Sequence, residues 1–159
     1  SIIMGLAAGI TINTDIVEKG LQQEQTHEHA MFFMEVNKTP LNLRADRFQL
    51  QARDVHLEGN RSRIVHKHAE GVTWGRFLDT VNISINSTGN STCIQMPRQE
   101  FCGNTTVLLN GEEFEREKVI QQGDKLAVVQ GTNPEERAEA FMELGMPTEY
   151  REIEPGRMA

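Results

Sequence analysis

Gly123-Asp124-Lys125-Leu126-Ala127-Val128-Val129 is the stretch that decides the fold of this chain. A Gly-Asp turn leads directly into an uninterrupted apolar run, which predicts a buried strand. Upstream, residues 105–109 form a second apolar run that ends in Asn110-Gly111, a strong β-hairpin signal. Residues 105–129 are therefore predicted to form part of a β-sheet.

A helix is predicted on the N-terminal side of this region. Trp74, Phe77, Leu78 and Val81 fall at i, i+3, i+4 and i+7, which is the spacing of one helix face. Thr73 stands where an N-cap is needed. We expect this face, including the single tryptophan, to pack in the core.

Further strands are predicted over residues 27–36, 47–57 and 64–69. Asn133-Pro134 begins a C-terminal helix, because proline fits the first helical turn. The predicted fold class is α+β and mostly β: an antiparallel or mixed sheet with one packed helix, an N-terminal strand and a C-terminal helix. The predicted divisions are an N-terminal apolar strand or anchor remnant with a polar linker (1–26), a β-rich globular domain (27–132), and a C-terminal helix and tail (133–159).

The composition indicates a polar globular protein. The 159 residues are 38% hydrophobic and 25% charged, with a net charge of −7. Nucleic acid is not an expected partner, because its binding needs clustered Lys and Arg and here these residues form no run. Phosphate-binding glycine loops, Gly-x-Ser-x-Gly elbows and His-Glu-x-x-His helices are absent from the sequence. An enzyme is therefore not the expected function, although a His-ligated metal enzyme stays open.

The apolar N-terminal segment allows three interpretations. Residues 2–10 are about half as long as a membrane helix needs to be, and Ser1 is not an initiator methionine. The segment is the remnant of a signal or membrane anchor, an ordinary core strand, or a strand donated to a neighbouring copy. In the last case the assembly face would consist of Ile2, Met4, Leu6 and Ala8.

Six of the ten asparagines begin an Asn-x-Ser/Thr triplet without proline. With 17 Ser and Thr among 159 residues, chance predicts about one such triplet. The excess indicates N-linked glycans and a chain that has crossed a membrane. The predicted glycosylation sites are Asn37, Asn60, Asn82, Asn86, Asn90 and Asn104.

The two cysteines are predicted to form a disulfide. Cys93 and Cys102 would close a short loop around Pro97. A disulfide is the usual state in an oxidising compartment. A catalytic redox pair is not expected, because the spacing is not Cys-x-x-Cys.

Four of the five histidines lie in two His-x-His pairs, His27/His29 and His66/His68, and the fifth is His56. Residues two apart on a strand point to the same face, so each pair presents two imidazoles side by side. If the strands are neighbours, all five converge. Neutral imidazole is a favoured ligand of zinc and copper, and the predicted cofactor is one of these ions.

Three nearby residues are candidate additions to this metal site. Met31 shares the strand parity of His27 and His29 and would suit Cu⁺. Glu28 and Glu70 are candidate outer partners that would orient an imidazole. The alternative interpretation is a surface face on which histidines serve as ordinary polar strand residues.

Part of the chain resembles β-grasp domains of the ubiquitin-like and sulfur-carrier type. The resemblance rests on Leu109-Asn110-Gly111-Glu112 and residues 123–129, and covers about residues 64–130. It implies a sheet with a packed helix. The sulfur-carrier role is not implied, since it needs a C-terminal Gly-Gly and this chain ends with Met158-Ala159.

A second resemblance covers about residues 27–132. The runs 27–30 and 64–73, the triplet His56-Leu57-Glu58 and the cysteine pair are similar to a group of small extracytoplasmic archaeal domains. These domains usually follow a single N-terminal membrane anchor and are common in ammonia-oxidising archaea. Some are labelled thiol-disulfide enzymes, but the required Cys-x-x-Cys is missing here. The resemblance implies an archaeal surface location and a common pattern for the five histidines.

Two functions fit the sequence. The first is an N-glycosylated extracellular or cell-surface domain that binds copper or zinc for capture, storage or delivery. The alternative is a structural subunit of an extracellular filament or pilus, assembled by donation of residues 1–12 to a neighbour. The expected partners are other copies of the chain or surface proteins, with a membrane only through a lost N-terminal anchor.

Overall fold

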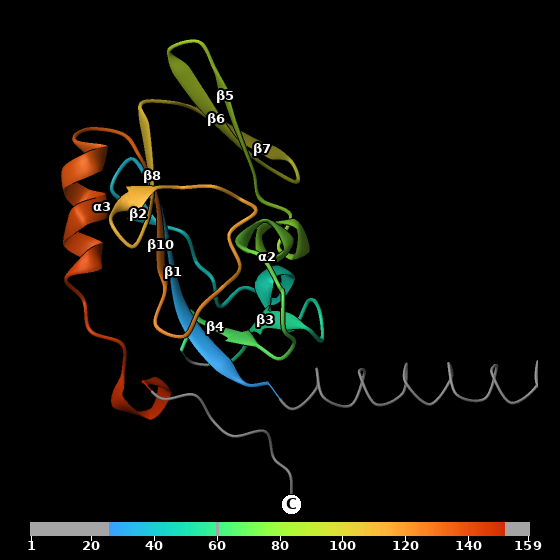
Figure 1. Ribbon diagram of the computed structural model, residues 1–159. Helices are drawn as coiled ribbons and strands as arrows, with labels where there is room; N and C mark the ends of the chain where they lie inside the picture. Colours follow the sequence, from blue (N-terminus) through green and yellow to red (C-terminus); the bar gives the residue numbers. More distant parts are fainter. Residues whose placement is uncertain (1–25, 60, 152–159) are drawn as a thin grey trace, which may run out of the picture.

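A computed structural model describes residues 26–59 and 61–151, and within them a mixed main sheet, a smaller antiparallel sheet and two α-helices (Figure 1). The main sheet has the order β3-β4-β1-β10-β8-β9, and β2 pairs with β1. Its strands are β1 (Glu28–Val36), β2 (Thr39–Pro40), β3 (Val55–Leu57), β4 (Ile64–Lys67), β8 (Thr105–Leu109), β9 (Glu112–Glu113) and β10 (Lys125–Gln130).

The centre of this sheet is a parallel pair formed by the first and last strands. β1 and β10 run in register from Met31↔Lys125 to Val36↔Gln130. β4 flanks β1 and β8 flanks β10, both antiparallel. This is the strand order of a β-grasp sheet, with a helix between the second and third strands. The predicted α+β class is confirmed, and the β-grasp-like part extends back to β1, beyond the range of the sequence resemblance.

The helix α2 (Trp74–Thr80) covers one face of the main sheet. Thr73 caps it as predicted, since its side chain accepts a hydrogen bond of 3.0 Å from the backbone N–H of Arg76. Trp74 is fully buried, and Phe77 packs edge-on against Phe32 of β1. The predicted helix and its core face are confirmed.

The second α-helix, α3 (Pro134–Met142), lies on the opposite side of the sheet (Figure 1). It buries Ala138 and Phe141 against Met31 and Val129. Alternate residues of β1 therefore serve two cores: Ala30, Phe32 and Met34 face α2, while Met31 and Phe33 face α3. Because both faces are covered, β1 reads as a nearly continuous apolar run.

The smaller sheet consists of β5 (Ser84–Thr88), β6 (Ser91–Met96) and β7 (Gln99–Gly103) and lies at the top of Figure 1. Cys93 and Cys102 face each other across β6 and β7 and form a disulfide, so this prediction is confirmed. Five of the predicted glycosylation sites are exposed: Asn37, Asn82, Asn86, Asn90 and Asn104.

The structure differs from the sequence prediction between residues 47 and 57. Only Val55–Leu57 form a strand there, preceded by a short 3-10 helix, η1 (Asp46–Phe48). Phe48 is buried and the chain turns at Leu50, whose φ is +50°. The predicted strand is interrupted here because Phe48 turns into the core and Leu50 adopts a left-handed backbone conformation, which a regular strand does not contain.

Some predictions concern residues outside the described part of the chain. These are Asn60 and the assembly face Ile2, Met4, Leu6 and Ala8. The donated-strand hypothesis therefore stays a prediction. Among residues 26–59 and 61–151, no helix has the length and apolar character that crossing a bilayer requires.

Removing the disulfide tests its contribution to stability. Replacing Cys93 and Cys102 together by serine frees a short loop in the unfolded chain and should lower the free energy of unfolding by about 2–3 kcal/mol. Denaturant unfolding under non-reducing conditions measures this change. An unchanged unfolding midpoint would show that the disulfide does not contribute to the stability of the fold.

Candidate metal centre

Strand register brings three of the histidines side by side. His29 of β1 pairs with His66 of β4, and His66 pairs with His56 of β3. The three therefore form a row across neighbouring strands on one face of the sheet. This face is the one that α3 covers further along β1.

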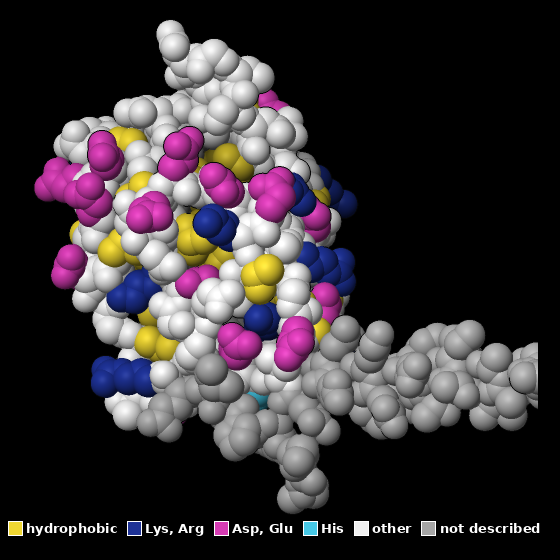
Figure 2. Space-filling view, in the orientation of Figure 1, with side chains coloured by type: hydrophobic (Ala, Val, Ile, Leu, Met, Phe, Trp, Pro, Cys, Tyr) yellow, Lys and Arg dark blue, Asp and Glu magenta, His cyan; other side chains and the backbone are white. Residues whose placement is uncertain are grey.

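The remaining two histidines lie next to this row. His27 stacks obliquely on His29 and on His68, with ring centroids 4.6 and 4.5 Å apart. His56 lies 4.9 Å from His68 by the same measure. The structure thus gathers all five predicted histidines in one cluster, at the end of the sheet where β1 begins. A histidine is visible at the corresponding lower end of Figure 2.

His27, His66 and His68 have the spacing of a metal-ligand set. Each offers a ring nitrogen, and the three nitrogens lie within 4.8 Å of one another. Nε2 of His27 and Nδ1 of His66 are 3.5 Å apart. Two nitrogens bound to one tetrahedral zinc ion would be about 3.3 Å apart, given zinc–nitrogen bonds of about 2.0–2.1 Å. The nitrogens of His27 and His66 therefore already lie close to the separation that a shared ion requires.

His56 is oriented by the backbone. Its Nδ1 lies 2.8 Å from the carbonyl oxygen of Ala52, which is a hydrogen bond in which Nδ1 donates. The hydrogen then resides on Nδ1, and the lone pair of Nε2 is left to face the cluster. A backbone carbonyl that accepts from one ring nitrogen in this way fixes the tautomer of a histidine whose other nitrogen binds a metal ion.

Glu58 is a site residue that the sequence prediction missed. Its carboxylate oxygens lie 3.6 Å from Nε2 of His56 and 3.8 Å from Nδ1 of His66. The side chain is 47% exposed, so it can adjust toward an ion. The sequence contained a signal for this residue, because Glu58 follows His56 by two positions and therefore has the same strand parity.

The two carboxylates proposed from the sequence do not occupy this position. Glu28 accepts hydrogen bonds from Nζ of Lys67 and from the backbone N–H of Gln122, at 3.4 and 3.1 Å. Strand alternation turns it away from the face that carries His27 and His29. Glu70 is exposed in the turn after β4, and Met31 belongs to the apolar cluster under α3.

Burial and crowding keep the central histidine neutral. His66 is 5% exposed, and desolvation together with the four neighbouring imidazoles lowers its pKa to about 3. Protonation would place a charge in a poorly hydrated position beside groups that repel it. Around neutral pH the ring is therefore in the form that binds a metal ion.

The C-terminal tail closes one side of the cluster. The ring of Tyr150, in the 3-10 helix η2 (Thr148–Tyr150), lies 4.8 Å from that of His29 and 5.8 Å from that of His66. Gln122 fixes the tail by donating from Nε2 to the carbonyl of Tyr150 at 2.6 Å and accepting from the backbone N–H of His29 at 2.7 Å. No sequence pattern had connected Tyr150 to the histidines.

A second group of potential ligands occurs among the described residues. Cys93, Glu100 and Cys102 lie close together on β6 and β7. The two sulfur atoms are joined in the disulfide, so neither is available as a thiolate ligand. The histidine cluster is the better candidate metal centre.

Comparison with known proteins adds no relative: no family model, no curated protein and no solved structure matches this chain.

The state of His66 predicts how the metal-free protein responds to acid. Between pH 6.5 and 3 the unfolded chain binds a proton at this histidine and the folded protein does not, so stability should fall as the pH is lowered through this range. Urea unfolding of chelator-treated protein at pH 7 and pH 5 measures the loss. His66→Asn should show a smaller decline, and equal declines in both proteins would contradict the assignment.

Proposed function

We propose that this protein is an extracytoplasmic domain that binds a divalent transition metal through its histidine cluster. The observation that carries the proposal is the set of ring nitrogens of His27, His66 and His68, within 4.8 Å of one another. His56 and Glu58 extend the set with an oriented imidazole and a carboxylate. Metal ligands have to lie close together, and the five imidazoles do so at one end of the sheet. Ordinary polar surface residues would have no reason to lie so close to one another.

The chemistry of the donors favours Zn²⁺ or Cu²⁺. Imidazole nitrogen and carboxylate oxygen suit both ions, while Cu⁺ prefers thiolate or thioether sulfur. Met31 packs in the apolar cluster under α3, and both cysteine sulfurs are in the disulfide. His27, His56 and His68 are only partly buried, and this accessibility suits capture and delivery of an ion.

The proposed location is the outside of an archaeal cell. The disulfide indicates a compartment that is not reducing. The exposed Asn-x-Ser/Thr triplets and the resemblance to archaeal extracytoplasmic domains support a glycosylated surface protein.

Metal titration tests the proposal. Metal-free protein should bind about one equivalent of Zn²⁺ or Cu²⁺, measured by isothermal titration calorimetry and by elemental analysis after dialysis. His66→Ala with His68→Ala should lower the affinity by at least about 100-fold. Because His66 is buried, His68→Gln serves as a second, milder variant, with circular dichroism as the folding check.

Glu100→Gln is the matched control, since it alters the other potential ligand group. It should leave stoichiometry and affinity unchanged. Failure of the folded wild-type protein to bind either ion would contradict the proposal, and so would equal binding by the folded histidine variants.

The role of Glu58 has its own test. Glu58→Gln keeps the shape of the side chain but removes the anionic oxygen beside His56 and His66, so the affinity for Zn²⁺ should fall about tenfold or more. Glu70→Gln is the matched control, because it removes an equal charge from an exposed turn close to His68 in sequence. If both variants lost the same affinity for Zn²⁺, Glu58 would act only through long-range electrostatic attraction and not as a ligand.

A further inference from the structure

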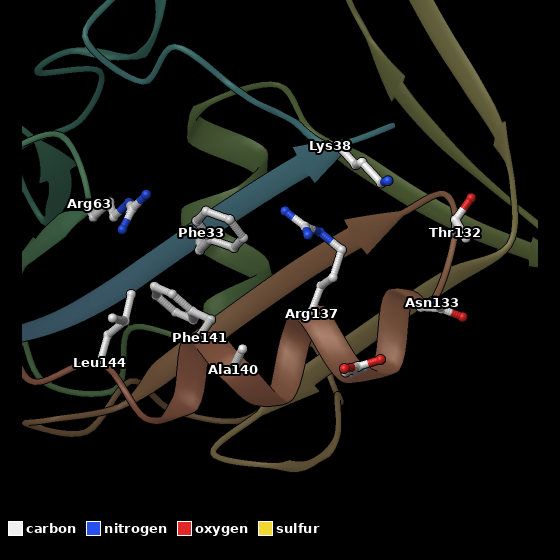
Figure 3. A pocket seen from close by; sticks show the side chains of 10 residues that line it. Phe33, Lys38, Arg63, Thr132, Asn133, Arg137, Ala140, Phe141 and Leu144 are labelled. Carbon is white, nitrogen blue, oxygen red and sulfur yellow. The ribbon is translucent and has the colours of Figure 1, made fainter.

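A separate cavity lies on the α3 side of the sheet, toward the opposite end of β1. It has a volume of about 510 Å³, within the range of small-molecule sites. Figure 3 shows it between the ends of β1 and β10 and the helix α3. The described residues that line it include Phe33, Lys38, Arg63, Arg137, Phe141 and Leu144.

One wall of the cavity is flat and apolar. The rings of Phe33 and Phe141 are stacked, with centroids 4.8 Å apart and planes 17° from parallel. Ala140 and Leu144 continue this surface along α3. Phe141 is itself only 2% exposed, so the apolar surface open to a ligand comes from Phe33, Ala140 and Leu144, and it fits a small apolar group such as an aromatic ring.

Positive charge converges on the same wall. The guanidinium carbon of Arg63 lies 4.8 Å from the centre of the Phe33 ring and 6.0 Å from that of Phe141. In Figure 3 the nitrogen ends of Arg63 and Arg137 lie on either side of Phe33. Lys38, from the turn between β1 and β2, completes a set of three cations around the cavity.

Arg137 is held in place and keeps donors to spare. Its Nε and one terminal nitrogen bind both carboxylate oxygens of Glu35, which is 2% exposed. A guanidinium has five N–H groups, so three remain for another acceptor. The ion pair thus holds the guanidinium at the edge of the cavity and leaves three of its N–H groups able to donate to a ligand.

The excess of positive charge around the cavity contrasts with the negative net charge of the whole chain. The protein carries a net charge of −7, yet among the described residues that line the cavity Glu136 is the only acid beside three cations. Arg137 is already paired with Glu35, but the described residues give Arg63 and Lys38 no acidic partner, so these two cations attract an anion. A carboxylate is the anion whose shape matches the N–H fork of a guanidinium.

We propose that this cavity binds a small organic carboxylate with a planar apolar body. The body lies against Phe33, Ala140 and Leu144, and the carboxylate receives hydrogen bonds from Arg63 and Arg137, with Lys38 adding attraction at the rim. This site is distinct from the histidine cluster and does not depend on metal binding.

Phenylacetate is a suitable probe, since it has one ring and one carboxylate. We expect it to bind with a Kd on the order of 1 mM, as its ten heavy atoms allow. Two-dimensional NMR of the metal-free folded protein measures the affinity and should show shifts that concentrate at Phe33, Arg63 and Phe141. Phenylacetamide lacks the charge and acetate lacks the ring, so each should bind at least about fivefold more weakly.

Arg63→Gln should weaken phenylacetate binding about tenfold, and Lys38→Gln less. Arg98→Gln is the matched control, because it removes an equal charge at the exposed turn between β6 and β7. Arg137 is left intact because its loss would strand the buried Glu35.

Three results would overturn the proposal: no phenylacetate binding at 50-fold above the expected Kd (on the order of 50 mM), equal binding of phenylacetamide, or equal losses in Arg63→Gln and Arg98→Gln. Zn²⁺ titration of Arg63→Gln should match that of the wild-type protein. The outcome is therefore readable whether or not the histidine cluster binds metal.

Discussion

The antiparallel pairing of β1 with β4 is the contact on which the rest of the structure depends. It sets His29 opposite His66 and Met31 opposite Ile64, and so fixes which side chains share a face. A slip of one residue would turn the histidines into the α2 core and Ala30 and Phe32 out of it. The cost of burying unpaired imidazoles and exposing aromatic surface makes that slip strongly unfavourable. The same apolar alternation that forms the core therefore also assembles the candidate metal centre.

The location of the cluster reconciles burial with polarity. The α3 face of the sheet is apolar over Met31, Ile64 and Val129, and changes to histidine only at the end where β1 begins. There the rings contact one another and Tyr150 in place of aliphatic side chains. Imidazole suits this boundary because its neutral form tolerates burial while each ring keeps a nitrogen lone pair for a ligand. A cluster of lysines or carboxylates could not be packed so closely without an ion present.

Local sequence patterns predicted which helices and strands form more successfully than they predicted which of these elements lie side by side. The helix face around Trp74 and the shared face of each His-x-His pair follow from periodicities of 3.6 and 2, which act within a few residues. No local period encodes contacts between separate segments of the chain. The pairing of β3 with β4 and the contact of Tyr150 with His29 are contacts of this kind. The extended run expected from residue 47 was interrupted by burial of Phe48 and a left-handed Leu50. Glu58 was within reach of the same parity argument as the histidines, whereas the arginines around Phe33 come from separate elements and had no sequence signal.

β1 also gives the molecule two chemically different poles. His29 stands near its first residue and Asn37 follows its last, so the two are about 26 Å apart along an extended strand. Asn37 lies beside the segment Gln130–Gly131, which in turn contacts Asn104, so two exposed Asn-x-Ser/Thr triplets meet at the far end of β1. The chain enters the described domain at residue 26, immediately before His27. Any tether made through the preceding residues therefore joins at the histidine pole, and carbohydrate on Asn37 and Asn104 would project from the pole furthest from that attachment.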